Sequence, residues 1–188
     1  MPPSAPTGQR AAASFSLGEE GNTTVDIVIQ PAYQQLEAVK ALLLEYTSML
    51  LEQNPAAAGS CLQRQNFEGE LANLAEKYGA PQGRLYLIRV DGAPAGCAAM
   101  KRLDRYRCEL KRLYIRPPFR GQGLARRLVE RLLTDAREEG YEAMLLDTFP
   151  FLSRAVDLYR QLGFYEIPSY NNTPLENLIY MKKDLRPA

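Results

Sequence analysis

The chain has 188 residues, of which 46% are hydrophobic and 24% are charged, and its formal net charge is +1. This size and balance suit one globular domain with a sizeable core, and they provide no whole-molecule field that would favour nucleic acid or a membrane surface. The sequence contains no histidine, which excludes a Ser-His-Asp triad, a Cys-His pair and histidine ligation of a metal.

The cysteines also narrow the class of protein. Cys61, Cys97 and Cys108 are odd in number, widely spaced and without a C-x-x-C pair. This pattern argues against a disulfide framework and a zinc site and fits a reducing compartment, so we expect a cytoplasmic protein without a metal. Charged residues interrupt the apolar stretches before they reach bilayer-spanning length, so no membrane segment is expected.

The N-terminal segment differs in composition from the rest. Residues 1–22 are rich in Pro, Ala, Ser, Gly and Thr and show no apolar periodicity, which predicts a disordered tail. Only Arg10 precedes the first acidic residue, Glu19, and this gives little support to an organelle transit peptide. Residues 23–188 are therefore expected to form a single domain.

Apolar periodicity divides that domain into strands and helices. Strands are predicted at residues 25–29, 84–90, 95–103, 107–115, 142–148, 164–167 and 178–182. Helices are predicted at residues 32–52, 67–78, 122–139 and 153–162. Because Asp91-Gly92 is a strong hairpin signal, the middle of the sheet is expected to be antiparallel. This order predicts an α/β (α+β) fold with a central mixed sheet flanked by helices.

A short glycine loop, Arg-Gly-Gln-Gly-Leu-Ala at residues 120–125, joins a predicted strand to the clearest predicted helix. Gly121 and Gly123 allow a ligand to approach the backbone, and the free amides of the helix N-terminus favour an anion such as a pyrophosphate. A tight strand-to-helix connection is the plainer alternative. The loop lacks the third glycine of the dinucleotide fingerprint and the Gly-Lys-Ser/Thr of a P-loop.

Positive charge is concentrated in the same region. Between residues 101 and 131 there are eleven Lys or Arg side chains, opposed only by Asp104, Glu109 and Glu130. This excess predicts that cations gather around the glycine loop, as would suit a ligand with several phosphates. A solvated basic face is the alternative interpretation.

Two segments resemble the GNAT superfamily of acetyltransferases. Residues 120–125 are similar to its Q/R-x-x-G-x-G/A motif, and residues 155–164, Ala-Val-Asp-Leu-Tyr-Arg-Gln-Leu-Gly-Phe, to its A-x-x-L-Y-x-x-L-G-F segment. The resemblance covers residues 84–183. It implies a GNAT-like fold and transfer of an acetyl group from acetyl-CoA, the co-substrate, to a primary amine of a small molecule or peptide, by direct attack in a ternary complex.

The resemblance also implies a cofactor site. Backbone groups of the strand before the loop would hold the pantetheine arm, and the loop amides would bind the pyrophosphate. The implied cofactor-binding residues are Leu113, Tyr114, Ile115, Arg120, Gly121, Gln122, Gly123, Leu124, Ala125 and Arg126. The family often has Asn seven residues before its tyrosine, whereas this chain has Leu152, so the arm would be held differently here or by the backbone alone.

Three residues are implied to be catalytic. Tyr159 matches the family's tyrosine near the thioester sulfur, although its place on an apolar helical stripe also suits packing. A lysine-like amine has a pKa of about 10.4 and must lose a proton before it attacks. Asp147 and Glu109 compete for that role, directly or through water, and each could instead serve a structural ion pair or turn. Cys108 is not favoured as a nucleophile because no histidine activates it.

Other functions stay open at this stage. A non-catalytic acyl-CoA sensor would tolerate loss of the three catalytic candidates, which are all present, and a nucleic-acid-binding module explains the basic stretch less well than CoA phosphates do. Residues 165–177, with Tyr170, Asn171 and Asn172, are expected to form a loop near the acceptor. Proteins of this type are often dimers, so a homodimer is a further expectation.

Overall fold

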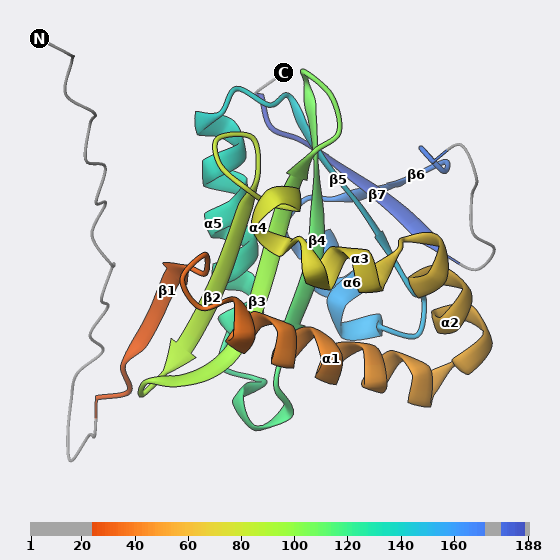
Figure 1. Cartoon of the computed structure of the whole chain (residues 1–188). Coiled ribbons are helices and arrows are strands. Elements are labelled where there is room, and N and C mark those ends of the chain that lie inside the picture. The colour runs from red at the N-terminus through yellow and green to blue at the C-terminus, as the bar shows by residue number, and fades with distance from the viewer. Residues whose placement is uncertain (1–23, 172–177, 187–188) are drawn as a thin grey trace, which may run out of the picture.

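The computed structural model describes residues 24–171 and 178–186. The predicted tail at residues 1–22 and the part of the expected acceptor loop at residues 172–177 lie outside these ranges. Seven strands form one sheet in the order β1-β2-β3-β4-β5-β7-β6 (Figure 1). The strands are β1 Ile27–Pro31, β2 Arg84–Val90, β3 Ala93–Arg102, β4 Arg107–Ile115, β5 Ala143–Thr148, β6 Tyr165–Ile167 and β7 Ile179–Asp184.

Helices cover both faces of the sheet, with α1 to α4 on one side and α5 on the other (Figure 1). They are α1 Leu36–Gln53, α2 Pro55–Arg64, α3 Phe67–Ala72, α4 Leu74–Lys77, α5 Leu124–Glu138 and α6 Ser153–Gln161, with a 3-10 turn at Pro117–Phe119. Neighbouring strands are antiparallel except β4 and β5, which α5 connects and which run parallel. The predicted mixed sheet with flanking helices is therefore confirmed.

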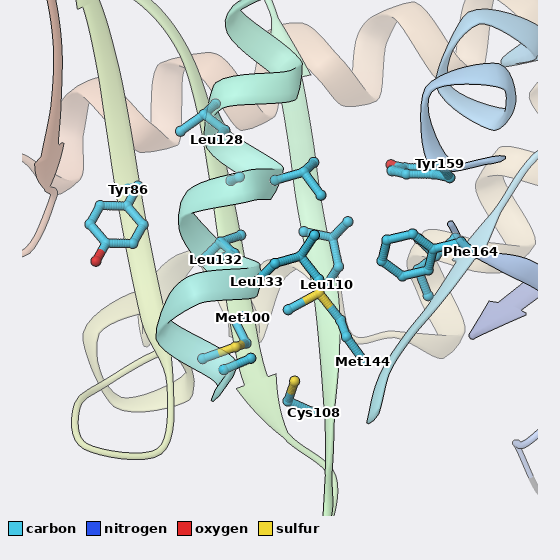
Figure 2. Close-up of a cluster of buried hydrophobic side chains, with 14 of the residues drawn as sticks. Tyr86, Met100, Cys108, Leu110, Leu128, Leu132, Leu133, Met144, Tyr159 and Phe164 are labelled. Carbon is cyan, nitrogen blue, oxygen red and sulfur yellow. The ribbon is translucent and has the colours of Figure 1, made fainter. Parts of the chain in front are cut away.

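Alternating side chains on the central strands form two cores. Cys97 and Ala99 of β3 pack toward α1, whereas Ala98 and Met100 pack toward α5. Figure 2 shows the α5 side of this arrangement, with leucines of the helix against Met100 and Leu110 of the strands. Tyr159 of α6 belongs to the same core, so α6 is anchored on the face that α5 covers.

Strands β4 and β5 pair over only a short distance. Their parallel register runs from Arg107 opposite Ala143 to Glu109 opposite Leu145, and no pairing follows among the described residues. Beyond this point the two strands diverge (Figure 1). The second half of β4 therefore has backbone groups that no strand on its β5 side satisfies.

A β-bulge interrupts β4 close to the point of divergence. Arg112 has a φ of +58°, and two β4 residues lie where the register with β3 shifts between Cys97 and Ala99. Leu110 and Leu113 both pack on the α5 core, while Lys111 and Arg112 both reach partners on the side of α2 and α3. The bulge thus places two consecutive cations on one face, which simple alternation forbids.

Two sequence predictions about the helices are wrong. Residues 55–64 form α2, which was not predicted, because Pro55 takes the first helical position and the Asn54 side chain accepts a 3.1 Å hydrogen bond from the Ala57 amide. The helix predicted at residues 67–78 is broken into α3 and α4 at Asn73. The Asn73 side chain donates to the Gly69 carbonyl at 3.0 Å and competes with the helical backbone.

Arg112 is held by a carboxylate from α3. Its Nε and Nη2 donate to the two oxygens of Glu70 at 2.6 and 2.8 Å, and both side chains are buried. Burial alone would raise the pKa of Glu70, but the hydrogen bonds and charge of Arg112, with Lys77 and Tyr78, outweigh it and lower the pKa from 4.5 to about 2. This ion pair therefore connects the bulge of β4 to α3.

We predict that Glu70→Gln destabilises the protein by about 3–5 kcal/mol at pH 7, because Arg112 stays buried without its carboxylate. Because the pKa of Glu70 is lower in the folded than in the unfolded protein, its charge stabilises the fold at pH values above the unfolded pKa. This stabilisation is lost as pH falls from about 4.5 toward 2. Urea unfolding across this pH range should show that the difference in free energy of unfolding between wild type and Glu70→Gln becomes smaller as the pH falls. Glu68→Gln, which changes an exposed acid on the same helix, is the control; an equal effect of both substitutions would contradict the role of the pair.

Candidate active site

A groove of ≈ 610 Å³ runs between the unpaired part of β4, the glycine loop and α6. Nine of the ten residues predicted to bind the cofactor line it; Gln122 does not. The remaining lining residues were not predicted to bind the cofactor. They come from α1, the 3-10 turn, the segment before α6 and α6 itself: Tyr46, Met49, Gln53, Phe119, Phe151, Leu152, Ser153, Arg154, Ala155, Leu158 and Gln161.

The glycine loop has the conformation that an anion site requires. Gly121 and Gly123 have φ values of +81° and +73°, which side chains disfavour, and a Cβ on either would meet open space. Gly123 precedes the first residue of α5 and no side chain caps the helix. The first amides of α5 thus lack an internal acceptor, and with the helix dipole they favour a bound phosphate.

Arg120 orders this loop. Its Nε donates to the Ile115 carbonyl at 2.9 Å, and its guanidinium lies 5.9 Å from the centre of the Tyr114 ring. The Ile115 carbonyl, one of the groups expected to meet the cofactor arm, is therefore occupied by the protein itself. Leu113 remains at the open edge of β4, beyond the last residue that pairs with β5.

Arg126 lies at the other side of the loop and links α5 to α6. Its Nη2 donates to Gln161 Oε1 at 2.6 Å, and its Nη1 is 3.7 Å from Glu130. Arg126 and Gln161 both line the groove. The contact therefore spans the groove from helix to helix beside the expected phosphate position.

The prediction that the basic residues gather around the loop is wrong for most of them. Of the eleven cations between residues 101 and 131, only Arg120 and Arg126 are among the described residues that line the groove. Most of the others pair with acids, many from distant segments: Lys101–Glu109, Arg107–Asp104, Lys111–Asp147, Arg112–Glu70, Arg116–Glu45 and Arg131–Asp135. Strand alternation and the bulge send neighbouring cations in different directions.

A second, smaller cavity of ≈ 60 Å³ adjoins the groove. Tyr46, Leu113, Leu152 and Ala155 line both spaces, so the two meet where β4 faces the start of α6. Both polar and apolar side chains line the cavity. Its polar residues include Gln65, Lys111, Arg112, Asp147 and Tyr159.

Tyr159 reaches this cavity from α6. Its side chain is buried, its ring packs 5.8 Å from that of Phe164, and Figure 2 shows the hydroxyl on the side of β4. The hydroxyl makes no hydrogen bond within the part of the chain that the structure describes. Burial raises the pKa of Tyr159 well above its usual value, and the neighbouring Tyr46 and Asp147 add to the effect. The phenol is thus protonated at neutral pH.

The two candidate bases occupy different positions. Asp147 lines the cavity, where its Oδ1 accepts a 3.1 Å bond from Lys111 Nζ and its Oδ2 lies 3.5 Å from Gln65 Nε2. Glu109 does not line the cavity, although it lies on the face opposite Cys108 and Leu110 as predicted. Lys111 lies between the two carboxylates, 3.7 Å from Glu109.

Glu109 is instead enclosed by partners. Its oxygens meet Lys101 at 3.0 Å and accept a 2.7 Å hydrogen bond from the Tyr170 hydroxyl. Burial would raise the pKa of Glu109, but Lys111 and Lys101 outweigh it and lower the pKa. Tyr170, from the expected acceptor loop, thus contacts β4 through Glu109 rather than lining the cavity.

Sequence reasoning missed the polar residues that surround Asp147. In the sequence, Lys111 and Arg112 appear only as part of a basic stretch, and neither Gln65 nor Tyr46 belongs to a motif, yet all four line the cavity. Gln65 Oε1 accepts a 3.0 Å bond from Arg112 Nη2 while its amide points toward Asp147 and Cys61. No local signal marks Tyr46 and Gln65, because α1 and α2 bring these two residues to β4 from more than 40 positions away.

The described residues add two negative findings. Within residues 24–171 and 178–186, no cluster of three or more Cys, Asp or Glu side chains could hold a metal ion. Over the same residues, every helix is too short or too polar to cross a bilayer.

Comparison with known proteins agrees with this geometry. The profile of the Acetyltransferase (GNAT) family matches residues 47–164. An uncharacterised N-acetyltransferase of Schizosaccharomyces pombe is 35% identical, over 84% of this chain and 99% of its own. The chain belongs to the GNAT family of acetyltransferases. It is an acetyl-CoA-dependent N-acetyltransferase.

Solved structures show the same fold. An acetyltransferase from Streptococcus agalactiae superposes with a TM-score of 0.66 at 20% identity, covering 84% of this chain and 98% of its own. An acetyltransferase from Salmonella typhimurium, solved with its cofactor acetyl-CoA, has a TM-score of 0.59 at 19% identity and covers 86% of this chain and 95% of its own.

We predict that Gly121→Ala raises the Kd for acetyl-CoA roughly tenfold, because a Cβ would enter the space above the loop amides. Gly92→Ala is a matched control, since Gly92 has a φ of +78° and equally open surroundings in the β2–β3 turn. Both substitutions should cost about 1 kcal/mol of stability through backbone strain. Calorimetric titration with acetyl-CoA distinguishes the two variants. Similar Kd values for both would contradict the assignment of the loop as the phosphate site.

Proposed function

We propose that acetyl-CoA occupies the groove and that its acetyl group is transferred to a primary amine held in the adjoining cavity, by direct attack in a ternary complex. One observation supports this best: the groove and the cavity meet at Leu113, Leu152 and Ala155, and Asp147 and Tyr159 line the cavity beside that junction. A thioester at the junction would have the phosphate loop on one side and both catalytic candidates on the other. The acceptor is a small molecule or the end of a peptide.

The cofactor would be held mainly by backbone. The open edge of β4 at Leu113 offers unpaired groups to the pantetheine arm, and the amides that begin α5 face the pyrophosphate. Leu152, where the family resemblance implied Asn, contributes an apolar side chain to both the groove and the cavity. Acetyl-CoA bound in a solved structure of the same fold supports this assignment.

The chemistry requires two proton movements. The substrate ammonium first loses a proton toward Asp147 or a water beside it, and the free amine attacks the thioester carbon. The resulting tetrahedral intermediate loses a second proton from nitrogen and expels the CoA sulfur as the C–S bond breaks. The products are the acetamide, CoA and one released proton.

Tyr159 would act on the leaving sulfur. Its raised pKa keeps the hydroxyl protonated, so it can donate a hydrogen bond as negative charge develops. Complete transfer from so weak an acid to a thiolate is uphill unless the phenol is reprotonated, and the intermediate's acidic N–H supplies that proton. Tyr159 is therefore proposed as a relay rather than a simple acid.

Two wider expectations belong to the same proposal. Residues 23–188 are taken as one catalytic domain. A reducing, cytoplasmic setting is consistent with the three cysteines, which are buried and free. A non-catalytic acyl-CoA sensor is less consistent, because it would not require a polar cavity joined to the cofactor groove.

We predict that Tyr159→Phe lowers kcat at least tenfold and leaves the Kd for acetyl-CoA unchanged. The melting temperature should also stay constant, because the hydroxyl makes no hydrogen bond within the described chain and the ring contact with Phe164 persists. Tyr46→Phe provides the comparison. Burial raises the pKa of Tyr46 to about 12, and its ring lies at the same junction. If only Tyr46→Phe lowers kcat, the relay belongs to Tyr46.

We predict that Asp147→Asn lowers kcat at least roughly tenfold, whereas Glu109→Gln leaves kcat within about twofold of wild type. The reason is position, since Asp147 lines the cavity and Glu109 is enclosed by Lys101, Lys111 and Tyr170. Glu109→Gln should instead lower stability by about 1–3 kcal/mol by leaving buried cations uncompensated. A large loss of kcat in Glu109→Gln together with an unchanged kcat in Asp147→Asn would reverse the assignment.

A further inference from the structure

Within the described part of the chain, two cationic side chains and one carboxylate line the small cavity. Among the described residues that line it, Lys111 and Arg112 are cationic and Asp147 is the one carboxylate. The charge of Arg112 is balanced by Glu70, but this acid lies behind the guanidinium on α3 and does not line the cavity. An acceptor entering the cavity therefore meets two cations and one anion.

Both cations keep donors for a ligand. Arg112 uses Nε and Nη2 for Glu70 and Gln65, and its Nη1 makes no hydrogen bond to the part of the chain described here. Lys111 Nζ has three N–H groups and is 3.1 Å from Asp147, with Glu109 more distant at 3.7 Å. The bulge lets both of these consecutive residues line the same cavity.

The carboxylate keeps acceptors in the same way. One oxygen of Asp147 accepts from Lys111, and the other has a long 3.5 Å contact with Gln65. A carboxylate offers about four lone-pair positions, so Asp147 retains capacity for a ligand ammonium. The cavity thus presents a cationic donor pair and an anionic acceptor a few ångströms apart.

From this arrangement, and resting on the proposed function, we infer that the acceptor carries a carboxylate close to its primary amine, as an amino acid does. The acceptor's carboxylate binds Arg112 Nη1 and Lys111 Nζ, and its ammonium binds Asp147 and faces the thioester. A polyamine or a lysine side chain has no carboxylate for these two donors, which would lose water without gaining a partner, and this is unfavourable in a site of low dielectric. The size of the cavity, ≈ 60 Å³, restricts the acceptor to a compact molecule.

Wild-type enzyme tests the inference with acceptors matched in shape. Alanine is compared with alaninamide and ethylamine, and leucine with leucinamide and isopentylamine. The amides keep the amine but lose the negative charge, and their ammonium groups are more acidic, which biases the comparison against the expected result. We expect kcat/KM to be at least roughly tenfold higher for each amino acid, mainly through KM, because donors left unpaired in the cavity penalise the other acceptors.

Two lysine variants locate the effect. Lys111→Met removes one proposed donor, and Lys101→Met is the matched control because Lys101 also pairs with Glu109, at 3.0 Å, but does not line the cavity. The ratio of kcat/KM for leucine to that for leucinamide should fall at least roughly fivefold in Lys111→Met and stay constant in Lys101→Met. Melting temperatures verify that both variants fold. An unchanged ratio in Lys111→Met would overturn the role of Lys111.

The outcomes separate this inference from the proposed function. If kcat/KM for the amides or the simple amines equals that for the amino acids, the proposed function stands and the inference is overturned. If acetyl-CoA binds in calorimetry but CoA release is not stimulated by any amine tested, both are overturned. If the ratio of kcat/KM for leucine to that for leucinamide falls equally in both lysine variants, the preference for a carboxylate depends on Glu109 and its surroundings, and the role of the cavity is overturned.

Discussion

The active-site region depends on one constraint, the early end of pairing between β4 and β5. Their parallel register stops at Glu109 and Leu145, after which a sheet edge exists in the middle of the sheet. Backbone groups exposed in this way need partners, and the groove that follows β4 offers them to a ligand. The phosphate loop, α5 and α6 are arranged around that edge, so the cofactor would complete a sheet that the protein leaves incomplete.

The bulge at Arg112 adapts this shared framework to an acceptor. It turns Lys111 and Arg112 to the same face, where Glu70 of α3 anchors one and Asp147 of β5 meets the other. Both ion pairs are buried, and buried pairs contribute less to net stability than to a defined geometry. Their position at the wall of the acceptor cavity suggests that this geometry serves recognition.

Several elements followed from local sequence signals. The strand at Arg107–Ile115, the glycine loop and the helix beginning at Leu124 were predicted nearly to the residue, because alternation, glycine and four-residue spacing act within a few positions. Helix α2 was missed although Asn54-Pro55 is a recognisable helix start. The broken helix at Asn73 depends on a side-chain hydrogen bond that propensity does not reveal.

The sequence by itself determined the family, the strand–loop–helix unit with its glycine loop, and three catalytic candidates, Tyr159, Asp147 and Glu109. Only the tertiary structure decided that Asp147 borders the cavity while Glu109 is withdrawn from it, and that Arg112 meets Glu70, 42 positions away, and Asp147 meets Gln65, 82 positions away. Motifs report conformations set by neighbouring residues. The cavity proposed for the acceptor is instead built from a bulge and from helices packed onto it, and those contacts are set by the shape of the whole core.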